Sequence, residues 1–221
     1  MKGMTYSSFR LSLRLKDIFP LIDVVFISRE LQKTGYIIQQ PVRLPTLVHP
    51  SQLSLNGILA IKENGYVDVN TEKNVIGYQN HDIEKVFQGF NEILDIIEKM
   101  PQYESTKVWF YEIEGNLRYD TEKDTSHGFG FKGPNVNLVQ QLTSKIDEEV
   151  GFKTIKVSSK GKNPSSENFL ELSIEPYIVS PRELSVILVY RLENKEKLVE
   201  NGKKIIANLE KLVNSLILSR D

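Results

Sequence analysis

The sequence predicts an α+β protein made of two pseudo-repeated lobes, residues 1–103 and 104–221, packed as one globular unit. Three observations predict this class: alternating apolar and polar runs typical of strands, longer runs with one apolar stripe typical of helices, and the same order of these runs in both halves. The expected order is β-α-β-β-β-α, with one further strand in the first lobe. We expect mainly antiparallel sheet with the helices on one face.

The first strand shows the clearest alternation in the chain. Residues 9, 11, 13 and 15 are apolar, and polar residues stand between them. Because successive side chains of a strand point to opposite faces, the apolar set is expected in the core and the polar set on an open face. The polar set is Ser8, Arg10, Ser12, Arg14 and Lys16.

A first helix is expected between this strand and about residue 33. Asp17 can cap it, Pro20 is tolerated in its first turn, and Gly35 ends it. The expected buried stripe is Leu21, Ile22, Val25 and Phe26.

A hairpin is predicted after an extended segment at residues 36–38. The pair Asn64-Gly65 stands between the alternating runs 58–62 and 66–69. This is the strongest short-range hairpin signal, because both central residues of a type I′ turn need positive φ.

The first lobe closes with a strand at residues 75–79 and a long amphipathic helix that opens at Asn80 or Asp82. The apolar stripe of that helix is Ile83, Val86, Phe87, Phe90, Ile93, Leu94 and Ile97.

The second lobe repeats this order. Residues 107–119 predict a strand or a tight hairpin at Gly115-Asn116, and Pro134 starts a helix. Asn194 caps a last helix of roughly 24 residues. Further strands are expected at residues 152–158, 168–175 and 183–192.

The last helices of the two lobes align at a fixed offset of 112 residues. Residues 84–87 (EKVF) fall on 196–199 (EKLV), and residues 97–100 (IEKM) fall on 209–212 (LEKL). A repeat of this length is a whole fold unit rather than one rung of a solenoid. In topology alone, the doubled layout resembles the saddle of TATA-binding proteins and the doubled strand-helix-strand-strand ligand-binding folds, and such a likeness does not transfer function.

Composition excludes several classes of function. The 28 Lys and Arg residues balance 29 Asp and Glu residues, which disfavours non-specific binding to nucleic acid. With no cysteine, there can be no disulfide, thiolate zinc site or cysteine nucleophile. No signal peptide or run of about 18 apolar residues is present, so we expect a cytoplasmic protein with no membrane contact. The absence of cysteine and the abundance of Lys, Glu and Ile would suit a thermophile.

A glycine-rich segment at residues 128–133 (GFGFKG) fits G-x-G-x-x-G and precedes a predicted helix. A dinucleotide site needs an acidic residue about 20 positions further on, and the sequence at 157–160 reads VSSK. The remaining alternatives are an anion contact and close packing against this segment. The candidate anion-binding residues are Gly128, Gly130, Lys132 and Gly133.

No catalytic, metal or cofactor site is predicted. There is neither a G-x-S-x-G motif nor a P-loop, and the carboxylates that share strand faces, at 112 and 114 and at 171 and 175, are more simply solvated charges. The three histidines, none at metal-ligand spacing, are His49, His81 and His127.

The most suggestive surface is the basic row Arg10, Ser12, Arg14 and Lys16, which contrasts with acidic Glu171 and Glu175 in the second lobe. A sheet with one basic and one acidic end suits protein contact or self-association. We therefore expect a non-catalytic binding or regulatory protein with a protein partner or a homo-oligomer. The alternatives are a nucleic-acid-binding protein using the sheet face, and a small-molecule or anion sensor using the cleft between lobes.

Overall fold

The computed structural model describes residues 3–16, 22–39, 55–101, 103–121 and 154–218. Over these ranges the chain forms one antiparallel sheet of nine strands, together with three α-helices and a short 3-10 helix. The strands are β1 (Gly3–Leu15), β2 (Ile37–Ile38), β3 (Asn56–Lys62), β4 (Gly65–Asn70), β5 (Val75–Asn80), β6 (Val108–Asp120), β7 (Ile155–Ser158), β8 (Phe169–Pro176) and β9 (Glu183–Leu192). The helices are α1 (Val24–Lys33), α2 (Ile83–Ile97), η2 (Ser105–Lys107) and α4 (Lys195–Leu218).

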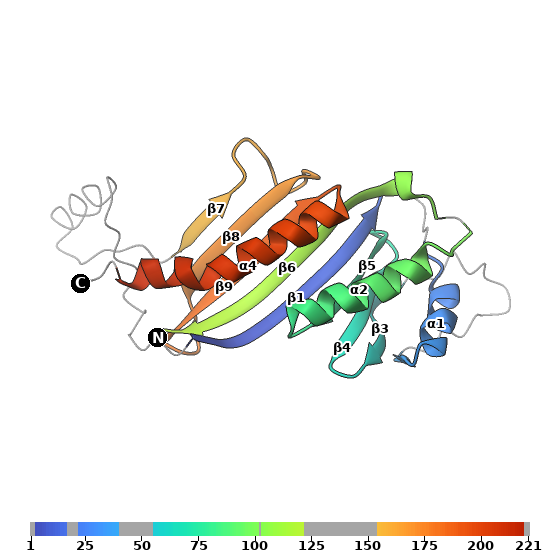
Figure 1. Cartoon of the computed structure of the whole chain (residues 1–221), viewed down its shortest axis with the longest axis horizontal. Helices are drawn as coiled ribbons and strands as arrows, with labels where there is room; N and C mark the ends of the chain where they lie inside the picture. Colours follow the sequence, from blue (N-terminus) through green and yellow to red (C-terminus); the bar gives the residue numbers. More distant parts are fainter. Residues whose placement is uncertain (1–2, 17–21, 40–54, 102, 122–153, 219–221) are drawn as a thin grey trace.

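The sheet runs in the order β2-β3-β4-β5-β1-β6-β9-β8-β7, so the two longest strands lie side by side at its centre. β1 and β6 pair antiparallel, from Gly3 opposite Asp120 to Leu15 opposite Val108. Figure 1 shows both strands crossing the middle of the molecule. The two halves of the chain therefore contribute to one continuous sheet.

The helices of the described part of the chain lie on one face of this sheet (Figure 1). Helix α2 packs on β1, β4 and β5, helix α4 packs on β6 and β9, and α1 lies against α2 and β3. The apolar side chains of β1 enter this layer, as its alternation predicts. Fully buried side chains of the layer include Leu11, Leu13, Phe90, Ile93 and Ile113.

Two of the three described helices begin at the caps that the sequence predicts. The Asp82 carboxylate accepts a hydrogen bond from the Glu84 N–H (2.9 Å), and the Asn194 side chain accepts one from the Lys197 N–H (2.8 Å). Each bond satisfies a backbone donor that the first helical turn leaves unpaired. The predicted starts of α2 and α4 are confirmed.

Helix α1 begins later than predicted. Its N-cap is Asp23, whose carboxylate accepts from the Phe26 N–H (3.0 Å), and Asp17 lies outside the described residues. Both positions hold an aspartate ahead of an apolar run, so local sequence alone does not choose between them. Gly35 ends the helix as predicted, with a φ of 88°. The buried stripe is Val24, Ile27 and Leu31.

The predicted hairpin is confirmed as β3 and β4, but its turn lies one residue earlier than expected. Lys62 pairs with Gly65, so the turn is made by Glu63 and Asn64, and Glu63 has a φ of 53°. Gly65 belongs to strand β4. Packing rather than the turn requires a glycine here, because a Cβ on Gly65 would lie 2.0 Å from the hydroxyl oxygen of Tyr78.

The strand predictions in the second half are also confirmed where the structure describes them. Of the predicted residues 107–119, those from 108 on form most of one uninterrupted strand, β6, rather than a hairpin at Gly115, and Lys107 ends the 3-10 helix η2. Strands β7, β8 and β9 lie at the three predicted positions. The helix predicted at Pro134 and the segment 128–133 lie outside the described residues. Among the described helices, none is both long and apolar enough to span a bilayer.

Candidate functional site

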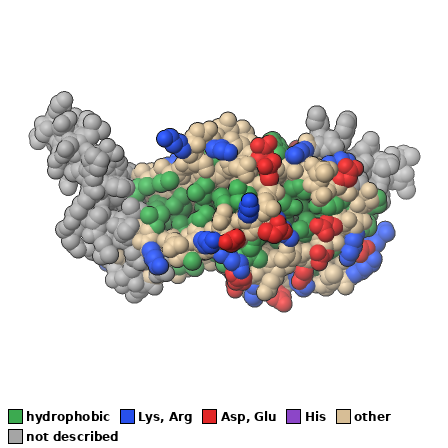
Figure 2. Space-filling view, turned by 45° about the horizontal axis from the view of Figure 1, so that its top comes forward, with side chains coloured by type: hydrophobic (Ala, Val, Ile, Leu, Met, Phe, Trp, Pro, Cys, Tyr) green, Lys and Arg blue, Asp and Glu red, His purple; other side chains and the backbone are tan. Residues whose placement is uncertain are grey.

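The face of the sheet opposite the helices carries mostly polar side chains. On β1 these are the residues that alternate with the core: Ser8, Arg10, Ser12 and Arg14. Figure 2 shows another side of the molecule, turned 45° from the helix-side view of Figure 1, and on that side hydrophobic, basic and acidic groups of the described residues are interspersed. The charges of the open face are organised by ion pairs between neighbouring strands.

Arg10 is held in one position by residues from both neighbouring parts of the sheet. Its Nη2 lies 2.7 Å from Asp68 Oδ2 on β4, and its Nη1 lies 2.8 Å from Glu114 Oε2 on β6. Only 17% of the Arg10 side chain is exposed. Burial by itself would lower the pKa of Arg10, but the hydrogen bonds and negative charges of Asp68 and Glu114 outweigh it and raise the pKa. Arg10 is therefore a fixed, neutralised charge.

The path from Arg10 to Asp68 crosses strand β5 at a glycine. Asp68 and Ser12 both pair with Gly77, which lies between β4 and β1. A Cβ on Gly77 would lie 2.9 Å from Arg10 Nε. The missing side chain leaves room for the guanidinium to reach the second strand along.

A second ion pair joins Glu112 of β6 to Arg191 of β9. The Arg191 guanidinium also donates to the Pro164 carbonyl and lies 4.9 Å from the centre of the Phe110 ring. Burial of Glu112, together with the nearby Glu114 carboxylate, raises the pKa of Glu112, while Arg191 acts in the opposite direction. This pair is largely desolvated, because the Glu112 side chain is only 10% exposed.

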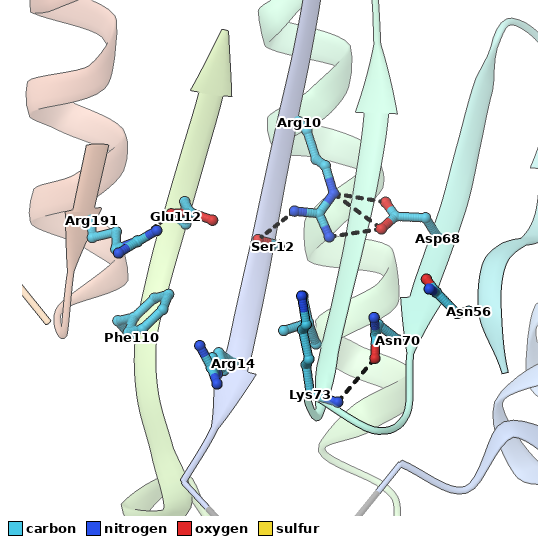
Figure 3. A pocket seen from close by; sticks show the side chains of 11 residues that line it. Arg10, Ser12, Arg14, Asn56, Asp68, Asn70, Lys73, Phe110, Glu112 and Arg191 are labelled. Atoms are coloured by element: carbon cyan, nitrogen blue, oxygen red, sulfur yellow. Dashed lines mark hydrogen bonds and ion pairs between the residues drawn. The ribbon is translucent and has the colours of Figure 1, made fainter. Parts of the chain in front are cut away.

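Two cations of the same face have no carboxylate partner among the described residues. The Arg14 guanidinium lies 4.6 Å from the centre of the Trp109 ring and 5.9 Å from that of Phe110. Lys73 lies in the turn between β4 and β5, where its N–H donates to Asn70 Oδ1 (2.9 Å). In Figure 3 the Lys73 side chain extends into the space between Arg14 and Asn70.

These groups surround a hollow of about 310 Å³ on the open face (Figure 3). It lies over strands β3, β4, β5, β1, β6 and β9. A second hollow of about 260 Å³ continues along the face on the other side of Arg10. The first hollow is lined by Arg10, Ser12, Arg14, Asn56, Asp68, Asn70, Lys73, Val75, Phe110, Glu112 and Arg191.

The structure brings three of the four residues of the predicted basic row into one site. Arg10, Ser12 and Arg14 line the hollow, whereas Lys16 follows the end of β1 as an exposed residue outside it. The candidate residues Gly128, Gly130, Lys132 and Gly133 lie outside the described residues. Of the histidines, His81 is described and packs edge-on against Tyr6, with ring centres 5.6 Å apart.

Sequence reasoning missed Asp68, Lys73 and Arg191. Each is distant in sequence from the basic row and reaches it only through the strand order β4-β5-β1-β6-β9. The prediction that Glu112 and Glu114 are solvated charges is wrong for Glu112, which is buried beside Arg191, whereas Glu114 is 44% exposed and pairs with Arg10. No grouping of His, Cys, Asp and Glu among the described residues could hold a metal ion.

Comparison with known proteins adds no family to this description. A scan against protein-family models finds no match, and a search of curated proteins finds no significant relative.

Proposed function

We propose that the protein is a non-catalytic binding protein, that it acts through the open face of its sheet, and that the occupant of this face is a second copy of the chain. The observation that carries the proposal is the one-sided arrangement of the sheet: the described helices cover one face, and the other presents side chains fixed by ion pairs. Fixed side chains lose little conformational entropy on association, which favours recognition.

The distribution of charge supports self-association. Arg14 and Lys73 lie near the end of β1, whereas Glu175 on β8 lies in the row of paired residues that reaches Tyr6 at the start of β1. Arg14 and Lys73 thus lie at the corner diagonally opposite Glu175, which shares its row with Arg118. A two-fold contact can place Arg14 and Lys73 of one copy against Glu175 of the other.

An apolar side chain lies between these corners. Ile187 on β9 points to the open face and is 42% exposed. Exposed single apolar residues are common on protein surfaces, so exposure alone does not mark Ile187 as a contact residue. Ile187 is relevant because it lies on the open face. It offers a position at which a charge would oppose the contact without disturbing the core.

Binding of single-stranded nucleic acid is the second candidate, and the aromatic rings argue against it. Such proteins stack bases on exposed rings. On this face an arginine already lies over two of the rings, with Arg191 4.9 Å from the centre of Phe110 and 5.7 Å from that of Phe169. Both phenylalanines are only 4% exposed, so neither offers a free stacking surface.

We also propose that residues 1–103 and 104–221 arose by duplication. The order of the strands supports this, because β1 and β6 meet at the centre of the sheet. On one side β5 follows β1, and on the other side β9 follows β6. The N-caps Asp82 and Asn194 stand at the offset of 112 seen in the sequence, and so do Tyr78 and Tyr190. In each half the tyrosine contacts the following helix, at Gly89 in the first and at Asn201 in the second.

Light scattering tests the proposed self-association. The chain of 25.4 kDa is expected to show the mass of two copies at high concentration and of one copy on dilution. Ile187→Lys should shift this equilibrium to the monomer. The control Val157→Lys, at an edge residue that is 52% exposed on the helix side, should leave it unchanged. A monomer at every concentration, or equal effects of both variants, would contradict the proposal.

A further inference from the structure

We propose that the hollow between Arg14 and Lys73 binds the phosphate group of a small molecule. The inference rests on the proposed use of the open face, and it names a ligand class for one part of that face. The hollow is formed by one chain, so phosphate binding does not require a second copy.

The balance of charge in the hollow favours an anion. Its lining holds four cationic side chains and two carboxylates. The carboxylates are already used, because Asp68 is paired with Arg10 and Glu112 with Arg191. The remaining positive charges belong to Arg14 and Lys73. Because neither has a carboxylate partner in the part of the chain that the structure describes, an anion that enters meets two cations rather than a neutral surface.

Neutral hydrogen-bond donors complete the site. Asn56 and Asn70 face each other across β3 and β4, and both line the hollow. The Asn70 side-chain oxygen accepts the Lys73 N–H, which leaves the Asn70 NH₂ group to donate. The Ser12 hydroxyl accepts from Arg10 Nη1 (3.1 Å), so its own O–H is also a donor. A tetrahedral phosphate can accept several such bonds at once.

The Arg14 side chain is held in place before any ligand binds. It lies on the Trp109 ring, and the Trp109 N–H donates to Glu167 Oε1 (2.9 Å). The stack gains from attraction between the cation and the ring. A guanidinium fixed in this way loses less side-chain freedom on binding than a free surface arginine.

The size of the hollow limits the ligand. A volume of about 310 Å³ is at the lower end of the range for small-molecule sites. It can take a phosphate group with a short organic part. A carboxylate carries a single charge and two oxygens, so it should bind the same cations more weakly.

Calorimetric titration with inorganic phosphate tests the site, at constant ionic strength and neutral pH. We expect saturable binding to the full chain, tighter than that of acetate, and weakened about tenfold or more by Arg14→Gln or by Lys73→Gln. Lys204→Gln, on the exposed side of α4, is the matched control and should bind phosphate as the unmodified chain does. Glycerol phosphate serves as the probe for an organic phosphate, and binding tighter than inorganic phosphate would support a small phosphorylated molecule as the ligand.

Circular dichroism and thermal unfolding of each variant establish that it is folded before binding is compared. Absence of phosphate binding by the unmodified chain would overturn the inference, as would equal affinity of Arg14→Gln, Lys73→Gln and the control. The same titration with Ile187→Lys separates this inference from the proposed self-association. Phosphate binding by monomeric Ile187→Lys would support the site independently of self-association. If the unmodified chain self-associates but does not bind phosphate, only the proposed site is refuted.

Discussion

Arg10 and Asp68 are joined across an intervening strand. The guanidinium on β1 passes over Gly77 of β5 and donates to the carboxylate on β4, with Nη2–Oδ2 and Nε–Oδ1 distances of 2.7 and 2.9 Å. The pair ties three adjacent strands together on the open face. It also neutralises the charge of Arg10, so that Arg14 and Lys73 are the cations of the hollow without a carboxylate partner among the described residues.

Asp68→Asn should destabilise the fold by about 1–3 kcal/mol, because it leaves the largely buried Arg10 with a weaker acceptor. Urea unfolding at neutral pH measures the difference. Lys33→Gln is the control, since it removes an exposed pair with Glu30 and should change stability by about 0.5 kcal/mol or less. Equal effects of the two variants would show that the Arg10 pair contributes no more than a surface pair.

Gly77→Val should displace Arg10 from Asp68, because a Cβ at Gly77 already meets Arg10 Nε at 2.9 Å. The cost should not add to that of Asp68→Asn, since both changes remove the same interaction. A double-mutant cycle by urea unfolding measures this coupling. Simple additivity would mean that Gly77 does not provide the path for the guanidinium.

Gly89→Ala should destabilise the protein by about 1–3 kcal/mol through overpacking, although alanine is the better helix former. The new Cβ would lie 2.4 to 2.7 Å from three atoms of the rigid Tyr78 ring. Gly202→Ala in α4 is the matched control. Its Cβ would meet only the flexible end of Ile113 at 2.4 Å, and thermal unfolding should show a smaller loss. A larger loss for Gly202→Ala would contradict this account of the two contacts.

Glu112→Gln should change the pH dependence of stability. Burial raises the pKa of Glu112 above its ordinary value, so the folded state binds this proton more tightly than the unfolded state. The Glu112 contribution is then fully present below the ordinary pKa of glutamate and is lost as pH rises through the folded pKa. Gln is neutral throughout, so the stability of the variant relative to the parent should rise with pH over this window. Urea unfolding at several pH values would contradict the sign if the difference stayed flat or fell.

Local pattern was enough to predict most of the elements. The period-two alternation of residues 9–15 identified β1 and its buried side, and the caps Asp82 and Asn194 located two helices. The prediction of an open polar face followed from the same alternation. Strands, helices and caps that depend only on neighbours in sequence can therefore be predicted from the sequence.

The features that the sequence does not predict depend on packing between residues far apart in the chain. Gly65 is a glycine because of Tyr78, which leaves no space for a side chain there, and not because the turn needs it. The ion pair between Arg10 and Asp68 depends on β5 lying between β4 and β1, and no local pattern encodes that order. Lys73 likewise enters the site only because its turn lies beside the end of β1.

Cysteine protection tests the claim that the open face is the contact surface most directly. The chain has no cysteine, so a single introduced one is an unambiguous probe. Maleimide labelling of Ile187→Cys on the open face should slow steeply as protein concentration rises, while labelling of Val157→Cys on the helix side should keep its rate. Labelling of Ile187→Cys that is independent of concentration, or protection at Val157→Cys instead, would contradict the account.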